Sequence, residues 1–199
     1  MGDSKLSVYN PNKIKDGMFY SKIIVDDEDI TIQVKKNKVV LDKENNKAIL
    51  EIDSNTKRYI NWISDEVIKE TSRNSESWFG KHISIDDCKS LYRDCIDEKK
   101  LKCFYDENSN FYKSKNQSIE HSELPDELLG IGLIKCCVVI FTKNSIYIRW
   151  EITEFKLKSD TDKNFINYGI RDLDEHKESI TEKEIEKKLK DKLKDISLF

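Results

Sequence analysis

The sequence predicts an α+β protein: an antiparallel β-sheet or barrel with a helical segment inserted in its middle and a helix at its C-terminal end. Three observations carry this prediction. Apolar and polar residues alternate with period two over 30–34 and 146–152, as in half-buried strands. Apolar residues recur at helical spacing within 54–98, and a capping box precedes an apolar stripe near the C-terminus. We expect one domain over residues 1–158, a helical insertion at about 54–98, and a polar linker with a helix over 159–199.

The N-terminal part is expected to form short strands. Turns rich in acidic residues or lysine separate the apolar runs, which is typical of antiparallel hairpins. The expected strands are 17–25, 30–34, 39–41 and 48–52, with turns at 26–29, 35–38 and 43–47.

Two helices are expected in the middle of the chain. Ser54 or Asn55 can cap the first, and Ser84, with Asp87 three residues later, can cap the second. In the second helix, one face is predicted to carry Cys88, Leu91, Tyr92, Cys95 and Ile96. Residues 78–80 are predicted to lie between the two helices.

The clearest predicted element is a hairpin of 133–142 and 145–158 that turns at 143–144. A strand at 101–105, a turn at 106–110 and a loop reaching 128 precede it. In the second arm Ile146, Ile148, Trp150 and Ile152 point one way, and Tyr147, Arg149, Glu151 and Thr153 point the other. The alternation changes phase afterwards, so we expect a β-bulge near Glu154.

The C-terminal helix, 180–199, is predicted from the capping box of Thr181 and Glu184 and the hydrophobic staple of Ile180 and Ile185. Its narrow apolar stripe suits contact with another protein or packing on its own domain.

Composition excludes some classes of protein. The net charge of −3 does not indicate a strongly basic duplex-DNA binder. The five cysteines are an odd number without a disulfide framework, which indicates a reducing compartment. No apolar run opens the chain or is long enough to cross a bilayer, so we expect an intracellular protein that is not in a membrane.

Signatures of catalysis are absent from the sequence. It contains no phosphate-binding loop, no nucleophile elbow and no zinc-protease motif. Cys88 and Cys95 are seven residues apart, which is not the spacing of structural zinc ligands. The acidic run 26–29 fits a solvated turn better than a metal site. We therefore predict no catalytic residues, no metal and no cofactor.

Three segments carry a resemblance: 74–81, with Trp-Phe-Gly-Lys; 102–108, with Tyr-Asp-Glu; and 134–157, a hairpin rich in isoleucine. In this order they resemble a family of small proteins encoded by nucleocytoplasmic large DNA viruses, and are similar to phage-type OB-fold single-stranded-DNA-binding proteins. The resemblance implies an OB-like barrel that binds single-stranded DNA without sequence preference, in support of viral DNA replication, recombination or repair. It also implies a location in the host cytoplasm, a viral factory or the virion.

Such a barrel binds strands by stacking bases on aromatic rings within a basic groove. The best candidates are Tyr147 and Arg149, which share the polar face of one predicted strand. Phe104 and Tyr105 lie on opposite faces of another strand, so one of them is expected to be exposed. The full set of candidate nucleic-acid-binding residues is Tyr147, Arg149, Lys143, Tyr20, Lys22, Lys35, Lys36 and Tyr105.

A second hypothesis is a virion structural or assembly protein, such as a minor capsid component or a scaffold-like interaction protein. The aromatic-rich sheet and the helix at 180–199 would serve interfaces equally well. In either case that helix would contact a second copy of the chain, a replication protein or a capsid protein.

Overall fold

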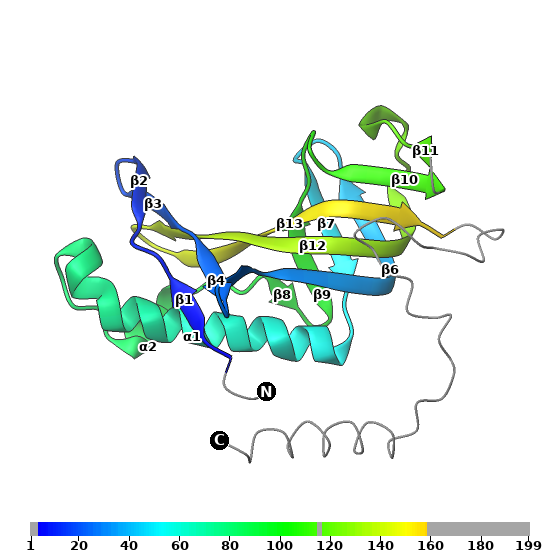
Figure 1. Cartoon of the computed structure of the whole chain (residues 1–199). Helices are drawn as coiled ribbons and strands as arrows, with labels where there is room; N and C mark the ends of the chain where they lie inside the picture. The colour runs from blue at the N-terminus through cyan, green and yellow to red at the C-terminus, as the bar shows by residue number, and fades with distance from the viewer. Residues whose placement is uncertain (1–3, 115–116, 159–199) are drawn as a thin grey trace, which may run out of the picture.

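The computed structural model describes residues 4–114 and 117–158. These residues form two α-helices, a short 3-10 helix and β-strands, which turns and loops connect (Figure 1). In chain order the elements are β1 (Leu6–Val8), β2 (Asn12–Lys15), β3 (Met18–Ser21), β4 (Ile23–Val25), β5 (Glu28–Asp29), β6 (Thr31–Asp42), β7 (Lys47–Glu51), α1 (Ser54–Phe79), α2 (Ile85–Leu91), β8 (Ile96–Asp97), β9 (Lys100–Phe104), β10 (Asn110–Ser114), β11 (Gln117–Ser118), the 3-10 helix η1 (His121–Glu123), β12 (Glu127–Thr142) and β13 (Ile146–Leu157).

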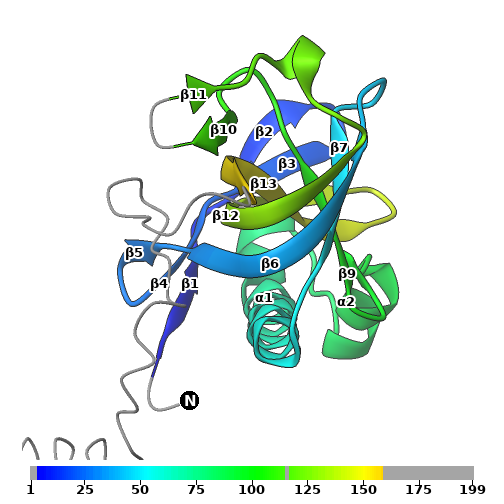
Figure 2. The same ribbon diagram turned by 90° about the vertical axis from the view of Figure 1, so that its right-hand side faces the viewer.

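Five strands close into a barrel. Around it β6 pairs with β7, β7 with β9, β9 with β13, β13 with β12, and β12 again with β6. Only the pair of β9 and β13 is parallel. In Figure 2, α1 is seen nearly end-on beneath the barrel strands. The prediction of a mixed α and β fold with an antiparallel barrel and helices inserted in the middle of the chain is therefore confirmed at this level.

Further strands extend the barrel. On one side β3 pairs with β12 beyond the barrel, and β2 pairs with β3. On the other side β10 adds to β13 in parallel, and β11 pairs with β10. A separate small sheet contains β1, β4 and β5. An ion pair connects this small sheet to the barrel: the Nζ of Lys135 on β12 lies 2.6 Å from a carboxylate oxygen of Asp29 on β5.

The turn predicted at 35–38 is wrong, because β6 runs without interruption through it. Its partner β12 pairs Gly130 with Asn37 and Gly132 with Val34, so two residues of β6 lie opposite one residue of β12. This is a β-bulge, which bends a strand without ending it. A polar run in the sequence looks the same in a turn and in a bulge. Here it forms a bulge because β12, which is distant in sequence, pairs with β6 both before and after it.

Two other strand predictions need correction. The single strand expected over 17–25 is divided between β3 and β4, which belong to different sheets, because β3 pairs with β12 and β2 whereas β4 pairs with β1 and β5. The loop expected before 128 contains β10, β11 and η1. Their pairing partners lie far away in the sequence, so local periodicity does not reveal them.

The helices lie where they were predicted, with different ends. Asp53 caps α1 by accepting a hydrogen bond from the Thr56 N–H at 2.7 Å, in place of Ser54 or Asn55. The helix then runs 26 residues to Gly80, which adopts the left-handed conformation that commonly ends helices. Residues 78 and 79 therefore lie in its last turn and not between the helices.

The helix α2 confirms Ser84 as its cap but is shorter than predicted. It ends at Leu91, so Cys95 lies outside the helix and Ile96 belongs to β8. Both residues are nevertheless buried, which explains why they matched the apolar face of a longer helix.

The predicted hairpin is confirmed as β12 and β13. Its predicted apolar face, Ile146, Ile148, Trp150 and Ile152, is fully inside the core. The register pairs Leu133 with Glu154 and Ile134 with Ile152, which leaves Thr153 as the extra residue of the expected bulge. The predicted linker and C-terminal helix, 159–199, lie outside the described residues. Within the described ranges no helix is long and apolar enough to cross a membrane.

Barrel closure predicts a strong effect of Gly130→Ala. An ideal Cβ at Gly130 would lie 1.9 Å from the carbonyl oxygen of Lys156 on β13, so the backbone of one strand must shift. We expect a loss of about 2 kcal/mol or more in the free energy of unfolding, measured by urea denaturation. Gly132→Ala is the control, because its Cβ would meet only side chains of Phe155 and Val34, at 3.1 Å. Equal losses for both variants would contradict the backbone explanation.

The contact between the small sheet and the barrel predicts a pH-dependent contribution to stability. Hydrogen bonds from Lys135, the larger effect, and from Lys22 lower the pKa of Asp29 from 3.8 to about 2. The folded state therefore favours the ionised carboxylate, and this stabilisation is present above pH 3.8 and lost as the pH falls to about 2. The stability difference between the wild type and Asp29→Asn should shrink over that interval in urea denaturation. A difference independent of pH would contradict the role of the charge.

Candidate functional site

A groove of about 440 Å³ lies on the outer surface of the barrel. It crosses β7 and β9, where alternate residues face outward because Ala48, Leu50, Leu101 and Cys103 fill the core. The residues that line it are Val40, Leu41, Asp42, Lys47, Ala48, Ile49, Arg93, Asp94, Cys95, Lys102, Cys103, Phe104, Tyr147 and Ile148. The groove therefore joins four barrel strands with the segment that follows α2.

The segment after α2 forms one side of the groove. The Arg93 N–H donates to the carbonyl of Ile146 on β13, and the Lys102 N–H on β9 donates to the carbonyl of Cys95, both at 2.8 Å. This segment therefore bridges β9 and β13. The bridge brings Arg93 to the groove.

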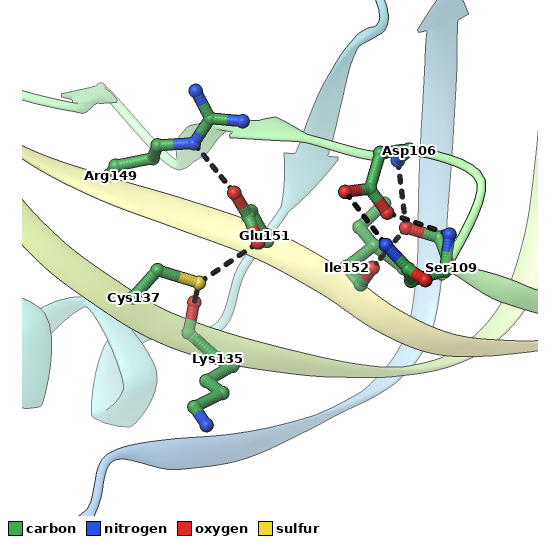
Figure 3. A network of polar contacts seen from close by, with 8 residues as sticks. Asp106, Ser109, Lys135, Cys137, Arg149, Glu151 and Ile152 are labelled. Atoms are coloured by element: carbon green, nitrogen blue, oxygen red, sulfur yellow. Dashed lines mark hydrogen bonds and ion pairs between the residues drawn. The ribbon is translucent and has the colours of Figure 1, made fainter.

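Phe104 and Arg149 form a stacked pair beside the groove. The Arg149 guanidinium carbon lies 4.3 Å from the centroid of the Phe104 ring, which is a cation–π contact. Arg149 Nε donates to one carboxylate oxygen of Glu151 at 2.6 Å, and the Cys137 thiol donates to the other at 3.0 Å (Figure 3). Glu151 is also the register partner of Phe104. Three strands thus fix the plane of the guanidinium.

The basic and the acidic side chains that line the groove differ in whether they have partners. Among the residues that the structure describes, no carboxylate forms an ion pair with Lys47, Arg93 or Lys102. The two carboxylates of the lining are already engaged: Asp42 accepts from Asn45, and Asp94 accepts from the Ile96 N–H. Both carboxylates keep their negative charge, so three positive and two negative groups give the lining a net charge of +1, and the three cations remain available to a bound anion.

Apolar surface lies between these cations. Val40 and Ile49, which face each other across β6 and β7, are 39% and 41% exposed. Exposed aliphatic side chains beside an aromatic ring suit the flat face of a ligand, and the surrounding cations suit its negative groups.

The structure brings some of the predicted site residues together. Tyr147 lines the groove, and Arg149 lies next to it on Phe104. Lys143 is exposed in the turn between β12 and β13. Tyr20 lies on β3, and Lys22 after it forms an ion pair with Asp29 at 2.8 Å.

Other predicted site residues lie elsewhere. Lys35 and Lys36 are at the bulge of β6 and not in a turn. Tyr105 is only 4% exposed, because its ring packs edge-on against Phe111 and His121, so it has no free face for stacking. Of the two aromatics in question, Phe104 is the more exposed one.

Sequence reasoning missed Lys47, Ile49, Arg93 and Lys102. The alternation of 47–51 and 100–104 would have placed Lys47, Ile49 and Lys102 on the outer face. No local signal shows that β7 and β9 pair with each other, or that Arg93 reaches them.

Comparison with known families gives one match. Residues 28–169 match a family of unknown function (DUF5871). The chain belongs to this family. The matched region covers more than half of the chain and contains all five barrel strands, but it begins after β2 and β3. No curated protein and no solved structure matches the chain.

Metal and thiol chemistry have little support in the described residues. No group of three or more His, Cys, Asp or Glu side chains there is arranged to hold a metal ion. All five cysteines are free thiols, and four of them are buried. Burial raises the pKa of Cys95 to about 12, and burial together with the hydrogen bond to Glu151 does the same for the pKa of Cys137.

These raised pKa values predict slow thiol chemistry. At neutral pH the thiolate, which is the reactive form, is scarce at both cysteines. The native protein should therefore react with a thiol-specific chromogenic reagent far more slowly than the same protein in urea, where five thiols should appear. A fast-reacting thiol in the native protein would contradict this and would indicate an activated cysteine.

Proposed function

We propose that the groove binds single-stranded nucleic acid without sequence preference, and that the ligand is DNA, as the sequence resemblance implies. One observation carries the proposal: the Phe104–Arg149 stack and Tyr147 lie beside three cations without carboxylate partners among the described residues. Aromatic platforms in a basic groove are the elements by which proteins bind single strands.

The topology of the barrel supports an OB-like assignment. Counted along the chain, the barrel strands are β6, β7, β9, β12 and β13, and their order around the barrel is first, second, third, fifth, fourth. This closed five-stranded barrel is consistent with the five-stranded Greek-key barrel of the OB fold. OB barrels bind their ligands over the second and third strands. The groove lies over the same two strands, β7 and β9.

The charges favour a polyanion. OB barrels also bind oligosaccharides, which are neutral and would not need Lys47, Arg93 and Lys102. Phosphates of a single strand would pair with these side chains, while bases stack on Tyr147 and on the Arg149 guanidinium. The guanidinium already has one face on Phe104, so it is held flat for a base on its other side.

The proposed biological role follows from this binding mode. A protein that covers single strands without reading sequence protects them during DNA replication, recombination or repair. The viral setting comes from the sequence resemblance alone.

The proposal is tested by titrating the whole 199-residue protein into labelled oligo-dT and a matched duplex, read by fluorescence anisotropy. We expect single-strand binding that weakens between about 50 and about 200 mM salt, with a log–log slope near −2 if Lys47, Arg93 and Lys102 each contact a phosphate. Phe104→Ala and Tyr147→Ala should each weaken binding about tenfold, the effect of one lost stack.

Leu129→Ala is the matched control, because Leu129 is exposed on β12 but does not line the groove. Circular dichroism melting should show that the variants are folded. Failure of the wild type to bind any oligonucleotide at low salt would overturn the proposal. The assembly hypothesis would then be tested by the oligomeric state in solution.

A further inference from the structure

A second exposed surface continues directly from the groove. We name it the arm: residues 138–149, the distal part of the β12–β13 hairpin, and residues 12–22, which contain β2 and β3. In the register Tyr147 lies opposite Ile140, Ile140 opposite Tyr20, and Tyr20 opposite Asn12. Residues directly opposite in neighbouring strands point to the same face of a sheet. Tyr147, which lines the groove, therefore shares one face with Tyr20.

The other face of the arm is covered by α1. Phe19 and Phe141, the neighbours of Tyr20 and Ile140 in the chain, have ring centroids 5.9 and 5.4 Å from that of Phe79 at the end of α1. Figure 1 shows this end of α1 beneath the arm. The face with Tyr20 points away from α1, and Tyr20 is 38% exposed. On the same face Ile140, which lies between Tyr147 and Tyr20, is only 8% exposed.

The arm is basic although the chain is acidic. Its residues include five basic side chains and one acidic one, whereas the whole chain has a net charge of −3. The charged residues of the arm are Lys13, Lys15, Lys22, Lys143, Arg149 and Asp16. Three of these basic side chains form ion pairs, Lys13 with Asp16, Lys22 with Asp29 and Arg149 with Glu151, whereas Lys15 and Lys143 have no carboxylate partner within the described residues. The exposed Tyr20 and these two lysines have the same chemistry as the groove.

The spacing fits a continuous ligand. Tyr147 and Tyr20 are two strands apart, which is about 10 Å at the usual distance between strands. This is about three times the base-stacking distance of 3.4 Å. A strand that leaves the groove at Tyr147 would reach Tyr20 within a few nucleotides.

We infer that a single strand bound in the groove continues over the arm, where Tyr20 is a second stacking site and Lys143 and Lys15 contact the backbone. This inference rests on the proposed function. It adds a part of the chain that precedes the family match, because β2 and β3 lie before residue 28. Its consequence is that the arm contributes only to ligands long enough to span both surfaces.

The test compares two lengths of oligo-dT, about 5 and about 15 nucleotides, within the range of sites on OB barrels. Tyr20→Ala should weaken binding of the longer strand about tenfold, the effect of one lost stack, and leave binding of the shorter strand unchanged. Tyr20→Phe, which keeps the ring, should bind like the wild type. Phe104→Ala should weaken binding of both lengths.

Tyr9→Ala is the matched control. Tyr9 is exposed as well, but its carbonyl accepts a hydrogen bond from Ser21, whose side chain is buried on the side of β3 opposite to Tyr20. The variant should bind both lengths normally. If Tyr20→Ala binds the longer strand like the wild type while Phe104→Ala does not, the inference is wrong and the groove proposal stands. If the wild type binds neither strand, both fail.

Discussion

The structure depends on the pairing of β12 with three other strands. Over 16 residues β12 pairs with β6 and β13, which closes the barrel, and then with β13 and β3, which forms the arm. Near its start, where β12 closes the barrel, β13 approaches it closely. Gly130 and Gly132 permit this approach, since Phe155 and the Lys156 carbonyl occupy the space where their side chains would lie. Bulges on both sides of β12 then adjust the register.

The groove and the arm are consequences of this pairing. The barrel turns the outer face of β7 and β9 toward β13, so that Phe104 and Glu151 become neighbours. Strand β13 also contains Tyr147 and Arg149, which belong to the arm. Because one strand contributes to both surfaces, a ligand can contact them without crossing a gap in the sheet.

The polar network around Glu151 shows how the barrel holds a cation in a fixed orientation. Glu151 receives hydrogen bonds from Arg149 and Cys137, which lie on different strands (Figure 3). The ring of its register partner Phe104 packs against the guanidinium. A guanidinium held this way loses little side-chain freedom when a ligand stacks on it, which favours binding. In this network Cys137 acts as a hydrogen-bond donor.

The sequence by itself determined the elements whose signals are local. Period-two alternation located β13, short apolar runs between polar turns located β7 and β9, capping residues located α2, and a phase change located the bulge, predicted near Glu154 and found at Thr153. It also placed Tyr147 and Arg149 on one outer face. Only the tertiary structure decided which strands pair, because hydrogen bonds between distant strands leave no periodic trace in either segment. For that reason the lysines at 35–38 were mistaken for a turn, Tyr105 for an exposed ring, and the contributions of Arg93, Lys47 and Lys102 were not seen.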